Sequence, residues 1–275
     1  MSSSRRHPMT DSDLQYHVGL SGSLIEGARY VLMPGDPDRV PVLAAAFDHS
    51  RPLGQSREYR SALAYAKDVP TPVLILSTGI GAPSAAIAIE ELARLGVRYF
   101  LRVGTTGAIQ QHVAPGDLVI SEASVRLEGT SSHYAPVEYP AVASIDMIRA
   151  LREAACALGV PHHSGMTCSS DSFWPGQERR DSFSAYVPRR FQGTLEEWRR
   201  LNVLSYEMEN SALFVVCRAL ALEAASVCAV VACRWQGEAV SHDAYAKAKH
   251  DLARVAREAV RRHATRAVEP IGGHG

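Results

Sequence analysis

The sequence predicts an α/β protein, and two observations lead to that prediction. Short apolar runs typical of buried strands, Val73–Ser77 and Val97–Val103, are each followed by a glycine-containing loop. Between them, residues 84–95 carry apolar side chains at helical spacing, with Pro83 opening the helix. Strand, loop, helix and strand in this order form a right-handed βαβ unit. Its two loops share one edge of the sheet, where ligands of α/β proteins bind.

The chain before this unit follows the same alternation. The apolar run Arg29–Met33 predicts a strand, and residues 34–38 predict a turn into a helix that continues to about Ala46. Pro37 with a capping Asp explains this turn structurally, yet a glycine turn before a helix N-terminus also suits an anion. Alternating side chains predict a further strand at residues 57–65.

The second half of the chain continues the alternation of strands and helices. Periodicity predicts, in order, strand 117–120, polar loop 124–139, helix 144–158, strand 165–170, strand 203–206, helix 212–222, strand 224–232 and helix 242–263. An apolar stripe indicates which face of the last helix packs on the sheet, and it comprises Tyr245, Ala248, Leu252, Val255 and Ala259.

Composition excludes several classes of protein. The 275 residues are 46% hydrophobic, which suffices for a full buried core. The 29 basic residues balance 29 acidic ones, so we expect no nucleic-acid partner and no membrane partner. No apolar run reaches about eighteen residues and the N-terminus lacks a signal-peptide core, which predicts a cytoplasmic protein. The five cysteines form no Cys-x-x-Cys pair, which favours reduced thiols and no zinc site.

The segment Tyr99–Ile109 is the feature around which the other candidates gather. Its first half is a buried strand by pattern, and its second half contains the turn-like tetrapeptide Gly-Thr-Thr-Gly at residues 104–107. Arg102 is the exception in the apolar half, because a guanidinium is costly to bury unless an anion meets it. Two interpretations stay open: a pair with a structural carboxylate beside an ordinary turn, or a ligand for phosphate or carboxylate.

Residues 171–180 are too charged and too aromatic for a routine turn. Phe173 offers a face for a flat ring, while Gln177 and Arg179 present hydrogen-bond donors and an acceptor nearby. A surface loop with one aromatic side chain tucked in is the alternative.

Glu207 and Glu209 stand where a strand gives way to a helix. Acidic side chains at a helix start are favoured by the helix dipole, which is the simpler explanation. A carboxylate at such a junction is also placed to accept hydrogen bonds from a sugar diol.

Five motifs in this order resemble the pyrimidine-cleaving branch of the nucleoside phosphorylase superfamily, the uridine phosphorylases. They are GDPDR at 35–39, STGIG at 77–81, LRVGTTG at 101–107, PGQER at 175–179 and YEME at 206–209. The resemblance implies a three-layer α/β/α fold with a mixed, partly closed central β-sheet. It implies one catalytic domain at residues 15–265. The polar, Ser-rich composition before it predicts a disordered N-terminal tail at 1–14, and we expect a flexible C-terminal tail at 266–275.

The resemblance also implies a role for each site residue. Phosphate would be held by Gly35, Arg39, Arg102 and Thr105, together with the neighbouring subunit's Arg57. Ribose would contact Thr106, Glu207, Met208 and Glu209, together with the neighbouring subunit's His17. The base would contact Phe173, Gln177, Arg179 and Arg234. The residues implied to be catalytic are Arg102, Gln177, Arg179 and Glu209.

The implied assembly is a homo-oligomer, a hexamer built as a trimer of dimers with active sites shared across each dimer. Inorganic phosphate would be the co-substrate, and no cofactor would be required. A structural potassium ion at the dimer interface would be held by the positions matching Glu58, Ile80 and Ser84.

The chemistry of these residues agrees with cleavage of a glycosidic bond by phosphate. Such a cleavage builds positive charge on the sugar and negative charge on the base, so it needs a held nucleophile and donors toward the base. We therefore expect reversible phosphorolysis of uridine to uracil and ribose 1-phosphate, without a protein nucleophile. The alternatives are a phosphorylase for purine nucleosides or thymidine, a nucleosidase that uses water, and a non-catalytic nucleoside-binding protein.

Two positions depart from the family pattern, and a further pair of residues differs from the purine-cleaving relatives. Cys233 stands where Asn is usual and Trp174 where Tyr is usual, and both are expected to border the base pocket. They bear on the choice among uridine, thymidine and modified pyrimidines. Purine-cleaving relatives usually carry a Ser-Asp pair after the last strand, where this chain has Arg234-Trp235, so the sequence favours a pyrimidine.

Overall fold

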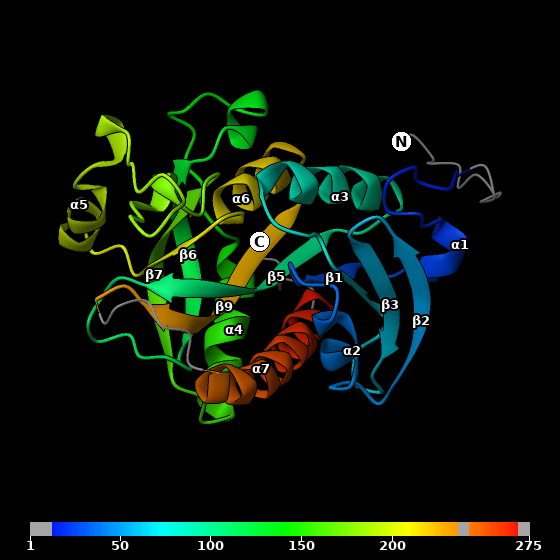
Figure 1. Ribbon diagram of the computed structural model, residues 1–275. Helices are drawn as coiled ribbons and strands as arrows, with labels where there is room; N and C mark the ends of the chain where they lie inside the picture. The colour runs from blue at the N-terminus through cyan, green and yellow to red at the C-terminus, as the bar shows by residue number, and fades with distance from the viewer. Residues whose placement is uncertain (1–12, 236–241, 269–275) are drawn as a thin grey trace, which may run out of the picture.

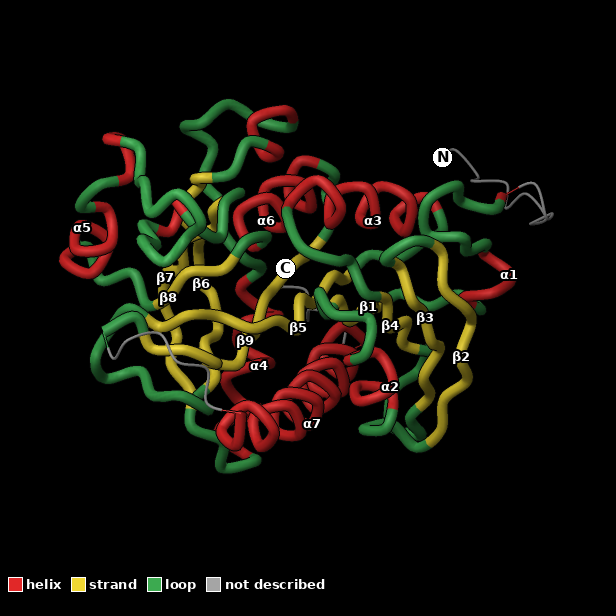
Figure 2. Tube along the Cα trace, viewed as in Figure 1, coloured by secondary structure: helices red, strands yellow, loops and turns green. Residues whose placement is uncertain are grey.

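The computed structural model describes residues 13–235 and 242–268. Within these residues nine strands form one mixed sheet, in the order β2-β3-β4-β1-β5-β8-β7-β6-β9. The strands are β1 (Tyr30–Met33), β2 (His49–Ser56), β3 (Tyr59–Tyr65), β4 (Val73–Leu76), β5 (Tyr99–Ala108), β6 (Leu118–Leu127), β7 (His162–Ser170), β8 (Ser205–Glu207) and β9 (Glu223–Cys233). β5 pairs with β9 as well as with β8, so five strands close into a ring while the other four remain open (Figure 2).

Helices cover both faces of this sheet (Figure 1). The helices are α1 (Gly22–Ile25), α2 (Arg39–Ala44), α3 (Ala82–Arg94), α4 (Ile145–Ala157), α5 (Thr194–Arg200), α6 (Asn210–Ala219) and α7 (His242–Val268). One hydrophobic cluster joins α2, α4 and α7 to the sheet, and a second joins α3 and α6 to its other face. The predicted three-layer fold with a partly closed sheet is therefore confirmed.

Alternation along β5 explains how one strand serves two cores. Leu101 and Val103 belong to the cluster under α4 and α7, whereas Phe100 belongs to the cluster under α3 and α6. Successive side chains of a strand point to opposite faces, so a strand covered on both faces must be apolar at every position. Arg102 breaks this run, because it lies on the same face of β5 as Phe100 but belongs to neither hydrophobic cluster.

The crossover from β4 through α3 to β5 places two loops at one edge of the sheet, as predicted. β4 and β5 both run parallel to β1, which lies between them. Their C-terminal ends therefore meet at the same edge, and α3 begins there at Ala82 with Pro83 in its first turn.

The Gly-Thr-Thr-Gly tetrapeptide at residues 104–107 is part of a strand, so the predicted turn is wrong. β5 pairs with β9 as far as Ala108, and β8 joins at Gly107. Small residues indicate a turn only when no partner strand is present. Inside a sheet, glycine instead marks a place where another group approaches the backbone closely.

Other boundaries also differ from the predictions. Strand β2 was not predicted, because it is an exposed edge strand that contains Pro52 and Gly54 and has a register irregularity between them. β6 continues to Leu127, four residues into the predicted polar loop, because β7 pairs with it to that point. Helix α5 lies in a stretch without a predicted element, and α7 continues to Val268, past the predicted domain end. Most of the predicted N-terminal tail lies outside the described residues.

No helix among the described residues is long and apolar enough to cross a lipid bilayer. All five cysteines are free thiols, and four of them are buried.

Candidate active site

Strand pairing along β5 has a gap, and a cavity lies beside it. β1 pairs with β5 up to Arg102, and β8 pairs with it only from Gly107 onward. Within the described chain, residues 103–106 therefore have a strand neighbour on the β9 side alone. The cavity of about 750 Å³ lies at this gap.

The cavity brings together most of the predicted site residues. They come from the ends of β1, β4, β5 and β8, from α2, and from the loop after β7. The predicted residues that line it are Gly35, Arg39, Ile80, Arg102, Thr105, Thr106, Phe173, Gln177, Arg179, Glu207, Met208 and Glu209.

Arg102 is a buried cation held between two carboxylates. Its terminal Nη2 pairs with Oε2 of Glu209, and its Nε lies 3.6 Å from Oε2 of Glu207. Burial on its own would lower the pKa of Arg102, but Glu209, then Cys228 and Glu207, raise it above its ordinary value. Arg102 is 7% exposed and lines the cavity. Its guanidinium therefore pairs with structural carboxylates and is also available to an anion in the cavity.

Arg39 is a second buried cation in the cavity. Its Nη1 donates to the backbone carbonyl of Val103, 3.2 Å away, within the gap in strand pairing. Burial lowers the pKa of Arg39, and the positive charge of Arg102 nearby adds to this effect. Two guanidinium groups that raise each other's energy in this way favour an anion between them.

Two glycines make room for these arginines. A Cβ on Gly104 would lie 2.6 Å from Nη1 of Arg102 and 2.8 Å from Sγ of Cys228, closer than real contacts allow. A Cβ on Gly35 would lie 3.0 Å from the Gly79 carbonyl oxygen and 3.5 Å from Nη2 of Arg39. The glycines at residues 35 and 104 are therefore required by close approach, not by a turn.

Glu207 and Glu209 are fixed by hydrogen bonds as well as by Arg102. Oε2 of Glu207 accepts the N–H groups of Glu209 and Asn210, both at 2.7 Å, at the start of α6. Oε1 of Glu209 accepts the N–H of Gly81 at 2.7 Å, which ties the start of α6 to the start of α3. Burial raises the pKa of Glu207, against the opposing effect of Arg102.

The loop after β7 forms the other end of the cavity. The Arg179 guanidinium lies 4.1 Å from the centre of the Phe173 ring, so one face of this ring is already covered. Gln177 is buried, and its backbone carbonyl accepts a hydrogen bond from Arg234 at 3.0 Å. Burial, together with Arg179 nearby, lowers the pKa of Arg234 to about 10. Arg234 thus supports the loop from behind, without lining the cavity.

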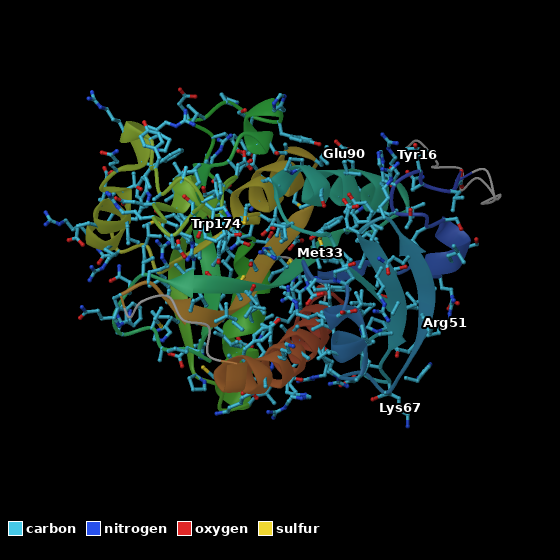
Figure 3. All side chains as sticks on the ribbon, viewed as in Figure 1. Tyr16, Met33, Arg51, Lys67, Glu90 and Trp174 are labelled. Atoms are coloured by element: carbon cyan, nitrogen blue, oxygen red, sulfur yellow. The ribbon has the colours of Figure 1, made fainter. Side chains whose placement is uncertain are left out.

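Five of the predicted residues do not line this cavity: Arg234, the potassium candidates Glu58 and Ser84, and the two residues assigned to the neighbouring subunit, His17 and Arg57. Nδ1 of His17 is 2.6 Å from Oε1 of Glu91 on α3, beside a separate hollow of about 650 Å³. Arg57 is exposed and donates to the hydroxyl of Tyr16 at 3.3 Å. Tyr16 lies well apart from Trp174, which belongs to the loop after β7 (the base loop, residues 171–180), as Figure 3 shows. A single subunit therefore does not bring His17 or Arg57 to its own cavity.

The expectation that Cys233 and Trp174 both border the base pocket does not hold for Cys233. Its Sγ points to the carbonyl of Val113 at 3.7 Å, in a small cluster that includes Val119 and Leu204. Trp174 is 45% exposed and packs edge-on against Phe173, with ring centres 5.1 Å apart. Trp174 therefore reaches the cavity only through Phe173.

Two tyrosines line the cavity without having been predicted to do so. Tyr206 precedes the acidic pair and could have been found from its place in the YEME motif. Tyr245 was assigned to the packed stripe of α7, but it lies at the cavity, with Nζ of Lys249 4.3 Å from its ring centre. Apolar periodicity cannot distinguish a tyrosine that faces a core from one that faces a cavity.

Comparison with known proteins agrees with this geometry. Residues 29–269 match the family model described as the phosphorylase superfamily. The chain belongs to the phosphorylase superfamily. Within this superfamily it is 44% identical to a uridine phosphorylase of Escherichia coli. The aligned region of 254 residues covers 92% of this chain and 99% of that protein.

Two further relatives in the superfamily show how far the likeness extends. A uridine phosphorylase of Haemophilus influenzae is 48% identical over 81% of this chain and 88% of its own length. A guanosine phosphorylase of Halorubrum lacusprofundi is 39% identical over 72% of this chain and 76% of its own length. Superfamily membership thus leaves the choice of base to be argued from the site.

We predict that Gly104→Ala displaces Arg102. The added methyl group would overlap the guanidinium, which cannot move without leaving two buried carboxylates unpaired. Breaking a buried pair in this way costs about 3–5 kcal/mol, so chemical denaturation should show a loss of about that size. The matched control is Gly129→Ala, where φ is −93° and the new Cβ would make only an ordinary contact, 3.6 Å from Oδ2 of Asp171. Equal, small losses in both variants would contradict the tight fit at residue 104.

Proposed function

We propose that the protein is a uridine phosphorylase, a pentosyltransferase that converts uridine and inorganic phosphate to uracil and ribose 1-phosphate. The observation that supports this most directly is the pair of buried guanidinium groups, Arg39 and Arg102, in one cavity with two carboxylates. Several relatives of 44–48% identity are uridine phosphorylases, which agrees with the proposal. Free cysteines agree with a reducing cytoplasmic location.

Phosphate would be bound by Arg39 and Arg102, with Thr105 and the backbone at Gly35 beside them. A phosphate dianion that pairs with Arg102 competes with Glu209 for the same nitrogen. Glu209 would stay anchored through its bond to the Gly81 N–H, and its released oxygen could accept the ribose diol. Thr106 and Met208 line the cavity between these groups and complete the sugar site.

The reaction would proceed by attack of the held phosphate on the anomeric carbon. Holding the nucleophile in place lowers the entropic cost of attack. Negative charge then spreads onto the carbonyl groups of the uracil, where Gln177 and Arg179 supply donors. Arg179 covers one face of Phe173, so the base would use the other face of this ring or displace the guanidinium.

The active site would be shared between subunits. His17 and Arg57 both lie far from their own cavity and near the surface. We propose that each subunit donates them to its neighbour in a dimer, and that three dimers form a hexamer. The donated guanidinium would add a third positive charge to the phosphate site.

We propose that Glu58, Ile80 and Ser84, near Gly79, supply one half of a potassium site. Glu58 Cγ and Ser84 Oγ lie 3.1 and 3.7 Å from the position that a Cβ on Gly79 would take, with the Ile80 backbone adjacent. Carboxylate, hydroxyl and carbonyl oxygens suit a hard cation. One subunit supplies too few of them to fill a coordination shell, so the ion would lie between two subunits. We propose it as structural, with no step of the reaction depending on it.

The test of the proposed function is uridine incubated with and without phosphate. Uracil and ribose 1-phosphate should form only when phosphate is present. Arg39→Ala should lower kcat/KM for phosphate about a hundredfold, since loss of one charged contact costs about 3 kcal/mol. Arg60→Ala is the control, because Arg60 makes only a surface pair with Asp38 at 3.1 Å. Release of free ribose without phosphate would favour a nucleosidase instead.

Sharing of the site predicts complementation between two inactive variants. Arg57→Ala and Arg39→Ala subunits should be nearly inactive alone, but a mixed dimer contains one site with both arginines. Subunits exchanged under mild denaturant should therefore regain a fraction of wild-type turnover. Mass spectrometry of the intact assembly would verify that subunits have exchanged. If an exchanged mixture showed no recovered turnover, donation across the dimer would be refuted.

The base loop predicts a preference for pyrimidines. Gln177 and Arg179 can pair fully with the carbonyl and imide edge of uracil, whereas a purine leaves them badly matched, a penalty of about 10⁴ in kcat/KM. Uridine should therefore be cleaved far faster than inosine or guanosine, and Gln177→Ala should reduce uridine turnover more than phosphate affinity. The guanosine phosphorylase among the relatives makes guanosine the sharpest competitor. Similar kcat/KM values for uridine and guanosine would reject the pyrimidine assignment.

A further inference from the structure

The closed part of the sheet contains a chain of hydroxyl groups that ends at Glu207. Ser124 lies on β6, Thr167 and Ser169 lie on β7, and Glu207 lies at the end of β8. All of these side chains are buried, as is Asn210 at the start of α6. Buried hydroxyl groups are costly unless each is hydrogen-bonded, so a row of them inside a sheet calls for a reason.

The hydrogen bonds in this chain can all run in one direction. Nδ2 of Asn210 donates to Thr167 at 3.2 Å, and the Thr167 hydroxyl donates to Ser124 at 3.2 Å. Ser124 and Ser169 are 2.9 Å apart, and the Ser169 hydroxyl donates to Oε1 of Glu207. Because Ser169 uses its only proton on the carboxylate, Ser124 is the donor of the 2.9 Å bond, and its hydroxyl also lies 3.5 Å from Oε1 of Glu207. Each hydroxyl thus accepts from one neighbour and donates to the next.

Ser169 is the residue that joins this chain to the carboxylate. Its oxygen also accepts the backbone N–H of Ser211 at 2.8 Å, so its position is fixed by α6 as well as by β7. A hydroxyl that already accepts hydrogen bonds is a stronger donor, because a chain of such bonds is cooperative. The direction of the chain therefore stabilises the ionised form of Glu207.

The charge state of Glu207 matters because of its neighbours. The charged and titratable groups that face it are Arg102 on β5, Glu209 at the start of α6, Cys168 on β7 and Cys228 on β9. Burial and the negative charge of Glu209 favour protonation of Glu207, whereas Arg102 and the hydrogen bonds oppose it. A protonated Glu207 would leave Arg102 with Glu209 as its one anionic partner among the described residues.

We propose that Ser169, with Ser124 and Thr167 behind it, is a positioning residue that keeps Glu207 ionised and thereby holds Arg102 in place for phosphate. The inference deepens the proposed function, since it concerns the same phosphate site. None of the three hydroxyl groups lines the cavity, so they act through Glu207 and not on the substrate.

The first test does not depend on any activity. Ser169→Ala removes a hydrogen bond to the carboxylate and raises the pKa of Glu207 further. The loss is felt fully where Glu207 is ionised and fades as the pH falls and Glu207 becomes protonated in both proteins. The melting temperature of Ser169→Ala should therefore fall below that of the wild type by more at pH 8 than at pH 5.

Ser205→Ala is a matched control for this measurement. Ser205 lies on β8, the strand of Glu207, and is fully buried, but its hydroxyl has no hydrogen-bond partner among the described residues. Its melting temperature should differ from that of the wild type by the same amount at both pH values. A pH-independent gap for Ser169→Ala as well would overturn the proposal.

The second test uses the pH profile of kcat/KM for phosphate with uridine as the co-substrate. The acid limb of Ser169→Ala should move up by about one pH unit. Loss of a hydrogen bond to a charged group costs enough free energy to raise the pKa of that group by about one unit. Ionisation of phosphate itself affects all variants equally, and Ser205→Ala should follow the wild type. An unmoved acid limb in Ser169→Ala would count against the role in positioning Arg102.

The first test separates this inference from the proposed function. If uridine is not cleaved by any variant, the proposed function fails while the melting temperatures still decide the role of the hydroxyl chain. If Ser169→Ala does not fold, Ser124→Ala takes its place in both measurements. Ser124→Ala should shift the melting temperature and the acid limb in the same direction by a smaller amount. If the effect of Ser124→Ala on melting temperature did not depend on pH, the proposal would be overturned.

Discussion

A buried positive charge on the central strand is the constraint on which the site depends. Arg102 interrupts an otherwise apolar strand, and a guanidinium in that position must be neutralised. Glu207 and Glu209 do this from β8 and the start of α6, and both carboxylates are themselves held by backbone N–H groups. The start of α3, the start of α6 and the end of β8 are all tied to this one side chain.

Closure of the sheet is what allows a polar interior next to two apolar cores. In an open sheet, residues on either face meet a helix layer, so polar groups there would be buried without partners. The ring of β5, β8, β7, β6 and β9 instead lets side chains from three strands meet one another. Glu207 can therefore be both buried and fully hydrogen-bonded, which open-sheet packing would not offer.

The sequence predicted the fold class because its signals are local. Residues 84–95 show a helical stripe and a proline start, and strands buried on both faces are unbroken apolar runs, so both are recognisable from spacing. The strand identity of residues 104–107 was not recognisable, because it depends on β9 and β8, which lie more than ninety residues away in the chain. The edge strand β2 was not predicted for the opposite reason, since its side chains are too exposed to leave an apolar pattern in the sequence.

Prediction of the site divides along similar lines. The cavity residues were found through motifs whose chemistry is evident, such as an arginine in an apolar strand. The pairing of Arg102 with both carboxylates could not be read from the chain, because β5 and β8 are adjacent only after the sheet closes. Likewise, apolar periodicity did not place Tyr245 at the cavity, and only the structure shows that Cys233 faces away from it.

The gap beside β5 has a consequence for how the site can change over evolution. Its length is set by where the β1 partners end and the β8 partners begin, so it can only grow or shrink by whole residues of strand register. Four residues at about 3.3 Å each make an opening of about 13 Å. A shift of one residue would also turn every β8 side chain to the opposite face, which would remove Glu207 from Arg102. New substrates must therefore be accommodated by the loops at the two ends of the opening, while the opening itself stays fixed.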